Sequence, residues 1–264
     1  MARIFAITNQ KGGVGKTTTS VNLAASLAAT KRRILMIDLD PQGNATMGCG
    51  VNKNEIERSA YDVLTKKASC EDVIVRSEIA GFDVIPSNGD LVAAEVELLN
   101  EIGREHRLRL ALNSIRHNYD FILIDCPPSL NMLTVNALSS ADGVIIPMQC
   151  EYYALEGLAA LMNTVEQIKE TINPELRIAG ILRTMYDPRN SLTKDVSAEL
   201  EEYFDDLVFK VAIPRNIRLA EAPSHGMPVL YYDKASKGAI AYLALAGEIV
   251  RKSKAATKPV LEAS

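Results

Sequence analysis

Long apolar runs and paired cysteines are both missing from this chain of 264 residues. No stretch approaches the ~18 consecutive apolar residues of a membrane-spanning helix, which predicts a protein outside the bilayer. The four cysteines stand far apart without a C-x-x-C pair, so neither a zinc ribbon nor a disulfide framework is expected, and a reducing compartment is favoured. At the amino terminus only residues 4–7 form an apolar stretch, and this predicts no signal peptide. We therefore expect a cytoplasmic protein.

A strong excess of charge of either sign is also missing. The formal net charge is −4 and the isoelectric point is about 5.5, which by itself argues against a nucleic-acid binder. Hydrophobic residues make up 47% of the chain and charged residues 23%, close to the globular average, so wholesale disorder is excluded. The charge is uneven, because residues 207–264 hold nine Lys or Arg against four Asp or Glu, a net +5 that leaves −9 on residues 1–206. The charge distribution therefore does not exclude an anionic partner that binds residues 207–264.

Apolar, β-rich runs alternate with helical patterns along the chain. The predicted strands are 3–8, 34–37, 82–86, 121–124, 144–147, 178–182 and 208–213. The predicted helices are 18–29, 91–116, 132–138, 154–171, 192–203 and 239–254. Strands that are apolar throughout are typical of a sheet buried on both faces. The alternation predicts a single α/β domain over residues 1–251, with a mostly parallel twisted sheet and helices on both faces, followed by a basic, flexible tail at 252–264.

A glycine-rich segment, IFAITNQKGGVGKTT at 4–18, joins the first predicted strand to the first predicted helix. Backbone N–H groups in such a turn can surround a phosphate, and the amino-terminal end of the helix adds a positive field. Lys16 is expected to reach the β- and γ-phosphates, and the Thr17 hydroxyl to bind Mg²⁺. Position 10 is Gln10 where the strict G-x-x-x-x-G-K-[ST] pattern has glycine, and Lys11 is a second lysine. The expected phosphate contacts are Gly12, Gly13, Val14, Gly15, Lys16, Thr17 and Thr18.

Three aspartates follow predicted strands. Asp38 and Asp40, in ILMIDLDPQGN, point the same way because strand side chains alternate with a period of two. They point toward the crevice where open α/β sheets bind ligands. Asp125, in FILIDCPPS, has the form of a Walker B acid that holds Mg²⁺ through water. A single aspartate at a strand end is more often a turn cap, but three after a phosphate loop favour a nucleotide site. We expect Asp40 to position the attacking water and Asp125 to hold the metal through water. Asp38 is expected to contact ligands of the metal and not the metal itself.

Five segments carry a family resemblance: KGGVGKTT, DLDPQGN, DCPPSL, QCEYYALEGL and IPRNIRLAEAPSHG. Together they closely resemble the ParA/Soj family of chromosome- and plasmid-partitioning ATPases, over about residues 3–246. The resemblance implies ATP and Mg²⁺ as cofactors, and slow ATP hydrolysis that a partner protein and DNA stimulate. It also implies a homodimer closed around two nucleotides, in which Lys11 of one subunit contacts the phosphates bound by the other. An ammonium there would stabilise charge on the γ-phosphoryl group, as an arginine finger does; a plain surface lysine is the alternative.

The resemblance implies further contacts outside the phosphate loop. Pro214 and Asn216 match the family's adenine and ribose segment, although an X-Pro turn that closes a strand would have the same pattern. Arg189 and Arg218 match positions that bind DNA without sequence preference in Soj-like proteins, and solvated surface arginines are the alternative. The remaining candidates for this basic patch are Arg215, Lys234 and Lys237. The implied partners are double-stranded DNA and a ParB-type centromere-binding protein, which places the protein on the nucleoid.

Two related classes share part of this pattern. MinD-like membrane-cycling ATPases share the Lys11 and Lys16 loop but end in an amphipathic membrane-binding helix, and residues 247–264 lack bulky apolar residues along one face. We therefore expect no stable membrane association and keep the MinD-like function as the alternative. Iron-protein relatives of nitrogenase hold a cluster with cysteines, and Cys126 could serve there or pack as a small buried hydrophobe. Because the loop starts at residue 10, no helix-turn-helix is expected before it.

Overall fold

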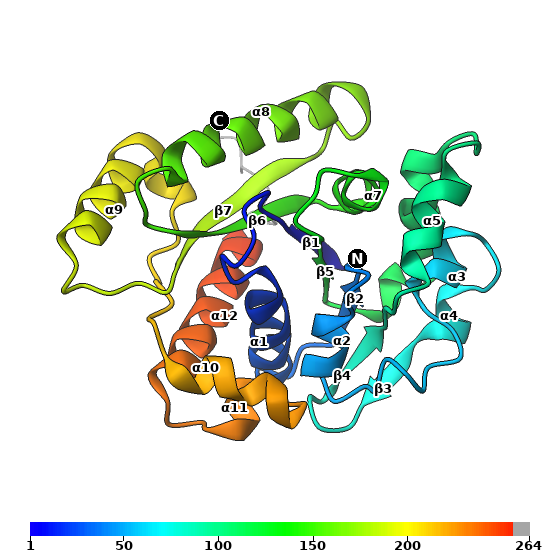
Figure 1. Ribbon diagram of the computed structural model, residues 1–264, viewed down its shortest axis with the longest axis horizontal. Helices are drawn as coiled ribbons and strands as arrows, with labels where there is room; N and C mark the ends of the chain where they lie inside the picture. Colours follow the sequence, from blue (N-terminus) through cyan, green and yellow to red (C-terminus); the bar gives the residue numbers. More distant parts are fainter. Residues whose placement is uncertain (256–264) are drawn as a thin grey trace, which may run out of the picture.

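Seven strands form one sheet in the computed structural model, which describes residues 1–255 (Figure 1). The strands are β1 (Arg3–Ile7), β2 (Ile34–Asp38), β3 (Val75–Ser77), β4 (Phe82–Ile85), β5 (Phe121–Asp125), β6 (Gly143–Gln149) and β7 (Arg177–Thr184). They lie in the order β3-β4-β2-β5-β1-β6-β7, and every neighbouring pair is parallel except β3 and β4. The predicted α/β class with a mostly parallel sheet is confirmed.

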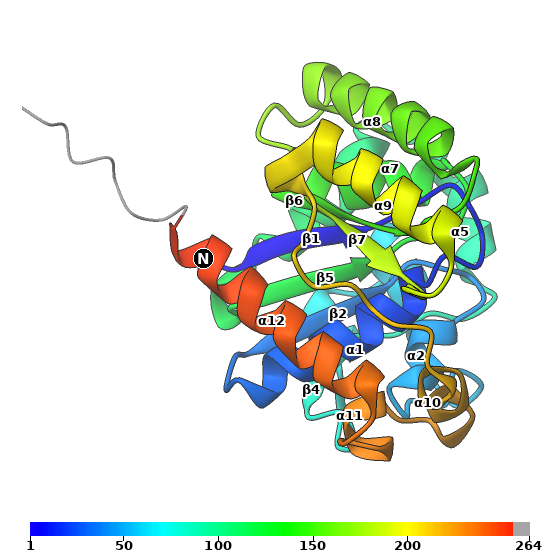
Figure 2. The same cartoon turned by 90° about the vertical axis from the view of Figure 1, so that its left-hand side faces the viewer.

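Helices cover both faces of this sheet (Figure 2). The helices that bear on one face are α1 (Lys16–Ala29), α2 (Asn44–Gly48), α10 (Ile217–Glu221), α11 (Val229–Tyr232) and α12 (Lys237–Ala255). Those that bear on the other are α3 (Ala60–Leu64), α4 (Cys70–Val73), α5 (Leu91–Leu98), α6 (Arg107–Leu112), α7 (Met132–Ser140), α8 (Ala154–Thr171) and α9 (Ser191–Phe204). Short 3₁₀ turns lie at Arg104–His106, Arg116–Asn118, Asp205–Leu207 and Ala222–His225.

The sheet separates two apolar cores. Along β1, Ile4 and Ala6 belong to the core beneath α5 to α9, whereas Phe5 and Ile7 belong to the core beneath α1 and α12. This alternation is the period of two that a strand imposes on its side chains. All four are buried, so β1, which leads into the glycine-rich loop, is anchored on both faces and on both edges.

The predicted strand over 208–213 is wrong. Phe209 N–H donates to the Ile181 carbonyl at 3.0 Å and Ile213 N–H donates to the Arg183 carbonyl at 2.8 Å, so both ends of the segment follow β7. Between them, the backbone N–H groups of residues 210 and 211 instead donate to the buried carboxylate of Glu248 on α12, at 3.0 and 3.2 Å. Because the Glu248 side chain accepts from the N–H groups in the middle of the segment, the segment forms only isolated β-bridges beside β7.

The single helix predicted over 91–116 is interrupted between α5 and α6. Gly103 adopts a φ of +67°, which breaks a right-handed helix. Asn136 of α7 then takes up backbone groups on either side of the restart, accepting from the N–H of Leu108 at 3.1 Å and donating to the carbonyl of Arg104 at 2.8 Å. Tertiary hydrogen bonds therefore replace part of the helical ladder.

Three further features concern elements outside the prediction and the chain end. Strand β3 and the short helices α2, α3, α4, α10 and α11 were not predicted; each has five residues or fewer, too few to show a period. Helix α12 continues through the first residues of the predicted tail to Ala255, and residues 256–264 lie outside the described part. Within residues 1–255, no helix has both the length and the apolar character that crossing a membrane requires.

Candidate nucleotide site

The glycine-rich loop connects β1 to α1 at the carboxyl edge of the sheet. Gly13 and Gly15 adopt φ values of +74° and +88°, which residues other than glycine rarely adopt. The Thr184 hydroxyl at the end of β7 donates to the carbonyl of Val14 at 2.8 Å and holds the loop against the sheet. Lys16 Nζ donates to the carbonyl of Lys11 at 3.1 Å, so its ammonium lies across the loop. Burial lowers the pKa of Lys16, and the charge of Asp125 opposes that shift.

Asp38 and Asp125 meet beside this loop because β2 and β5 are neighbours in register. Asp38 pairs with Asp125, which in turn pairs with Ile7, the last residue of β1. The Asp125 carboxylate accepts from the Thr17 hydroxyl at 2.9 Å and from the Ser20 hydroxyl at 2.7 Å, both on α1. The predicted Walker B acid therefore lies directly against the threonine that is expected to bind the metal.

Asp38 is held from the opposite side by α2. Its Oδ2 accepts from both the N–H and the hydroxyl of Thr46 at 2.8 Å, and its Oδ1 accepts from the Asp40 N–H at 3.0 Å. Asp38 and Asp125 are fully buried. Burial raises the pKa of each carboxyl, and the charge of Asp38 raises that of Asp125 further.

Asp40 lies at the rim of the site and is partly exposed. Its Oδ1 accepts from the Gln42 N–H at 2.9 Å, and the Ser87 hydroxyl donates to its carbonyl at 2.8 Å. Among residues 1–255 its Oδ2 has no hydrogen-bond partner. One carboxylate oxygen is thus fixed by the turn, while the other is available to accept a hydrogen bond from water.

Lys11 points away from the loop that it begins. Its Nζ donates to Glu151 Oε2 at 2.6 Å, and both side chains are about half exposed. The Lys11 backbone N–H donates to Asn9 Oδ1 at 3.0 Å, and Asn9 is fixed in turn by its bond to the Pro147 carbonyl at 2.8 Å. The lysine therefore lies on the surface of the carboxyl edge and does not reach the phosphate loop of its own chain.

A cavity of about 320 Å³ opens beside the loop, between α1 and the segment that leads into α10. Pro214 and Asn216 both line it, together with Thr18. The Asn216 side chain also caps α10 by accepting from the Arg218 N–H at 3.1 Å. The structure thus brings the predicted adenine segment next to the predicted phosphate loop, with apolar walls that suit a base.

The donor set fits a hydrated Mg²⁺ bound through phosphate oxygens. Mg²⁺ retains most of its waters and needs only one or two protein oxygens beside the substrate phosphates. Thr17 Oγ1 and Asp125 Oδ2, 2.9 Å apart, are such a pair. In the described residues no group of three or more His, Cys, Asp or Glu side chains forms a metal cage. Two buried carboxylates with raised pKa values are the environment that a nearby cation would stabilise.

The predicted basic residues come from the turn after β7 and from the chain between the start of α10 and the start of α12. Arg189 forms a two-pronged pair with Asp187, at 2.9 and 2.8 Å. Arg218 pairs with Glu221 at 2.7 Å and with Asp233 at 3.4 Å. The side chains of all five predicted basic residues are exposed. The backbone N–H of Arg215 donates to the Tyr186 carbonyl at 3.2 Å, which brings Arg215 near Arg189. The other two residues of the predicted basic patch are Lys234 and Lys237.

Several contributors were missed from the sequence because they act through partners distant in the chain. Ser20 on α1 and Thr46 on α2 hold the two buried carboxylates, and Thr184 holds the loop. Glu151 lies within the quoted QCEYYALEGL segment, but nothing in that segment indicates its pairing with Lys11. A serine four residues after Lys16, on the same helix face, is a signal that could have identified Ser20.

Cys126 follows Asp125 and is buried. Burial, followed by the charge of Asp125, raises the pKa of its thiol. A thiol in this environment retains its proton, so it favours the packing role over cluster ligation.

A phosphate loop after the first strand, at the carboxyl edge of a mostly parallel sheet, defines a P-loop nucleoside triphosphatase fold. The AAA domain family matches residues 2–178. The sporulation initiation inhibitor protein Soj of Bacillus subtilis is 53% identical over 94% of this chain and 98% of its own length. The chromosome partitioning protein ParA of Caulobacter vibrioides is 50% identical over 96% of this chain and 95% of its own. The chain belongs to the ParA/Soj family of ATPases.

A solved structure agrees with this placement. The cobyrinic acid a,c-diamide synthase of Mycobacterium smegmatis, with bound ATP analogue and magnesium, superposes with a TM-score of 0.85 at 36% identity and covers 98% of each chain.

Proposed function

We propose that this protein is a ParA-type ATPase that binds ATP with Mg²⁺, dimerises around two nucleotides and segregates a chromosome or plasmid. The observation that carries the proposal is the convergence of Lys16, Thr17, Asp38 and Asp125 beside a cavity lined by Pro214 and Asn216. The bound ATP analogue and magnesium of the M. smegmatis neighbour support the choice of ligand.

Hydrolysis needs a positioned water and a site that stabilises charge on the γ-phosphoryl group. The backbone N–H groups of the loop and the ammonium of Lys16 hold the phosphates, and the free Oδ2 of Asp40 orients the attacking water. Bound Mg²⁺ would neutralise phosphate charge, with Thr17 and Asp125 holding it. Because Asp40 lies at an open rim, water positioning is incomplete in a single subunit, so we expect slow intrinsic turnover.

Dimerisation completes the site from outside. Lys11 lies at the surface of the carboxyl edge, so its ammonium is placed to contact the phosphates of a facing subunit once it leaves Glu151. An exposed ion pair of this kind contributes only about 0.2–1 kcal/mol, which a phosphate contact readily exceeds. The triphosphate then decides whether the dimer forms.

The dimer is proposed to bind double-stranded DNA through Arg189, Arg218 and the other residues of the predicted basic patch. Each arginine is paired with a carboxylate, so the patch of one subunit has a reduced positive field. Two patches on a dimer restore the affinity, which makes DNA binding depend on ATP. A ParB-type protein then stimulates hydrolysis and releases the dimer from the nucleoid.

DNA retention tests this cycle directly. The purified protein is bound to non-specific duplex DNA with ATP, ADP or no nucleotide across a salt series, because phosphate contacts weaken steeply with salt. Lys16→Ala should lose ATP-dependent binding, and Arg189→Glu should lose DNA binding while it retains ATP-dependent dimerisation. Lys169→Glu, on the exposed face of α8, is the matched charge control. Equal DNA affinity in the ATP and ADP states would contradict the proposal.

The MinD-like alternative predicts binding to anionic liposomes in ATP. In α12, the residues Ala239, Tyr242, Leu245, Ala246 and Ile249 are buried in the core beside α1. The apolar face of that helix is therefore already covered by protein, which supports DNA over a membrane as the surface on which the dimer assembles.

A further inference from the structure

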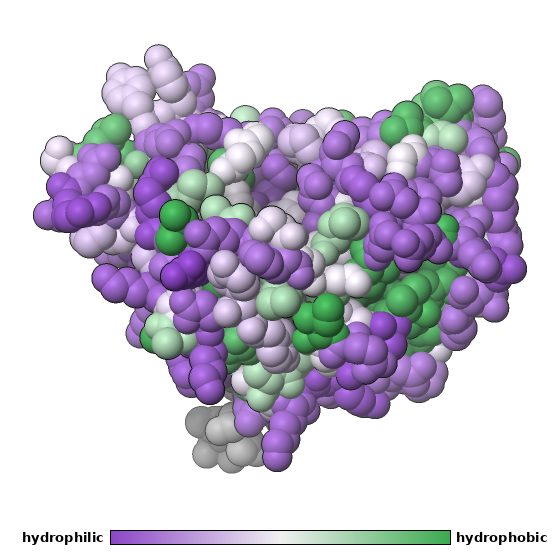
Figure 3. Space-filling view, turned by 60° about the horizontal axis from the view of Figure 1, so that its bottom comes forward, coloured by the Kyte–Doolittle hydropathy of each residue, from purple (hydrophilic) through white to green (hydrophobic). Residues whose placement is uncertain are grey.

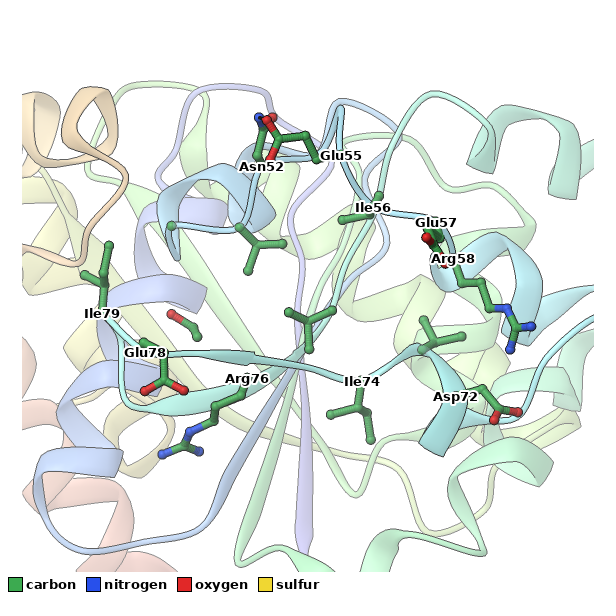
Figure 4. Close-up of a pocket in the computed structure, with 15 residues that line it drawn as sticks. Asn52, Glu55, Ile56, Glu57, Arg58, Asp72, Ile74, Arg76, Glu78 and Ile79 are labelled. Carbon is green, nitrogen blue, oxygen red and sulfur yellow. Dashed lines mark hydrogen bonds between the residues drawn. The ribbon is translucent and has the colours of Figure 1, made fainter.

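A hollow of about 710 Å³ lies along β3, at the opposite end of the sheet from β7 (Figure 4). Its lining includes every residue from Asp72 to Ile79 and, from the facing loop, residues 50–52 and 55–58. Consecutive side chains of a strand point to opposite faces of the sheet. A hollow that all of them line must therefore follow the edge of the strand itself.

This edge of the sheet is open. Strand β3 pairs with β4, and in the part of the chain that the structure describes no strand pairs with its other side. The outer edge of such a strand presents backbone N–H and C=O groups that can pair with another chain. Arg76, the charged residue at the middle of β3, does not cover them, because its guanidinium is turned back to Asp83 at 3.0 Å and to the Gly81 carbonyl at 2.9 Å.

The walls of the hollow combine an apolar floor with an acidic rim. The apolar lining residues are Val51, Ile56, Val73, Ile74, Val75 and Ile79. The charged lining residues are Glu55, Glu57, Asp72 and Glu78 against Arg58 and Arg76. Figure 4 shows Glu78 near one end of the strand, Asp72 and Arg58 beyond the other, and Glu55 in the loop opposite. In Figure 3 an apolar area bordered by hydrophilic residues lies on this side of the molecule.

Two of the carboxylates at the rim of the hollow are free to pair with a basic side chain of another chain. Glu57 and Glu78 are exposed, and neither has a hydrogen bond or ion pair with another residue of 1–255. Arg76 is neutralised by Asp83, which is not part of the lining. The rim therefore has a surplus of negative charge, and the floor offers apolar contact between the charges.

We propose that this hollow is a docking site for an extended, basic segment of a partner protein, which adds to β3 as a further strand. The segment's backbone pairs with the outer edge of β3, its aliphatic side chains pack on the floor around Val75, and its lysine or arginine side chains reach Glu57 and Glu78. Backbone pairing supplies affinity and the alternating side chains supply selectivity, as in other strand-addition sites. The site is separate from the nucleotide loop and needs no nucleotide.

Fluorescence anisotropy with synthetic peptides tests the site on the full-length protein. The probe is a short labelled peptide that alternates lysine with valine, and the controls alternate glutamate with valine and lysine with glycine. The protein variant is Glu57→Lys with Glu78→Lys, and the matched control is Glu166→Lys with Glu170→Lys on α8. Two further peptides have the backbone nitrogens methylated, on the lysines in one and on the valines in the other.

We expect saturable binding of the lysine–valine peptide and weaker binding of both control peptides. The rim variant should weaken it by about tenfold or more, which is the range of two exposed charge pairs reversed together, and should now bind the glutamate–valine peptide. One methylated peptide should fail and the other should bind, because alternate N–H groups face β3. No binding of the lysine–valine peptide overturns the proposal, as does equal binding of both methylated peptides or of the rim variant. An unchanged melting temperature shows that the rim variant is folded.

Discussion

Replacing Asp125 by asparagine is expected to stabilise the nucleotide-free protein while it removes ATP hydrolysis. Asp125 is fully buried, and burial together with the charge of Asp38 raises its pKa in the folded chain. Each unit of that rise costs the folded state about 1.4 kcal/mol once the carboxyl ionises. Asparagine avoids this cost but replaces one acceptor oxygen facing Thr17 or Ser20, a loss of about 1 kcal/mol. The pKa of Asp125 rises to about 8, and half of that rise already gives an expected net gain of about 2 kcal/mol, or roughly 6 °C in Tm.

The sign of the pH dependence distinguishes this cause from a general improvement in packing. A carboxyl with a raised pKa in the folded chain contributes its full stability below its unfolded pKa of about 4, and loses it as pH rises through the folded value. Urea unfolding in EDTA should therefore show a larger advantage for Asp125→Asn at about pH 8 than at about pH 5. Asp142→Asn is the control and should lose stability, because Asp142 pairs with Arg116 at 2.7 Å. A variant no more stable than wild type at the higher pH, or one with the same gain at both, refutes the reasoning.

Substitutions at two glycines and two threonines distinguish residues that stabilise the fold from residues that serve the proposed nucleotide site. Gly43→Ala should lower the free energy of unfolding by about 2 kcal/mol, because its Cβ would lie 2.7 Å from a backbone oxygen at a φ of +62°. Gly12→Ala, with no atom within 4 Å of the new Cβ, should keep its urea midpoint but reduce ATP-dependent dimerisation seen by light scattering; a lowered midpoint would count against this. Thr46→Val should cost about 3 kcal/mol, because it removes a buried hydroxyl from Asp38. Thr164→Val, at a half-buried position of α8 whose hydroxyl donates to the Ala160 carbonyl within the same helix, should change stability by less than about 0.5 kcal/mol. Similar losses for both threonines would contradict the assigned role of Thr46.

The elements that the sequence predicts well are those in which local pattern and tertiary packing agree. Apart from Arg3 at the start of β1 and the aspartates that end β2 and β5, these three strands are apolar and buried on both faces, so their positions follow from composition alone. The position of the glycine-rich loop follows too, because its glycines and Lys16 are contiguous in the chain. Asp38 and Asp125 were expected at the site because parallel strands bring their carboxyl ends to one edge.

The remaining features depend on partners that no local pattern contains. The segment 208–213 has strand composition, but the Glu248 carboxylate on α12 takes its central N–H groups. The region 91–116 has helical composition, but Asn136 on α7 takes its backbone groups at the restart. The pairing of Lys11 with Glu151 spans 140 positions and concerns two exposed side chains, for which sequence imposes little preference.

The position of β1 in the sheet affects how the protein is made. Of the seven strands of this sheet β1 is synthesised first, yet its two neighbours, β5 and β6, begin at Phe121 and Gly143. Until those strands are synthesised, β1 has no partner on either edge, and the glycine-rich loop that follows it has no sheet to hold it. Pairings this far apart in sequence form slowly, and the apolar strand stays exposed in the meantime. The glycine-rich loop therefore acquires its supporting sheet only after β5 and β6 have emerged, and of the seven strands β1 is accessible to chaperones for the longest time.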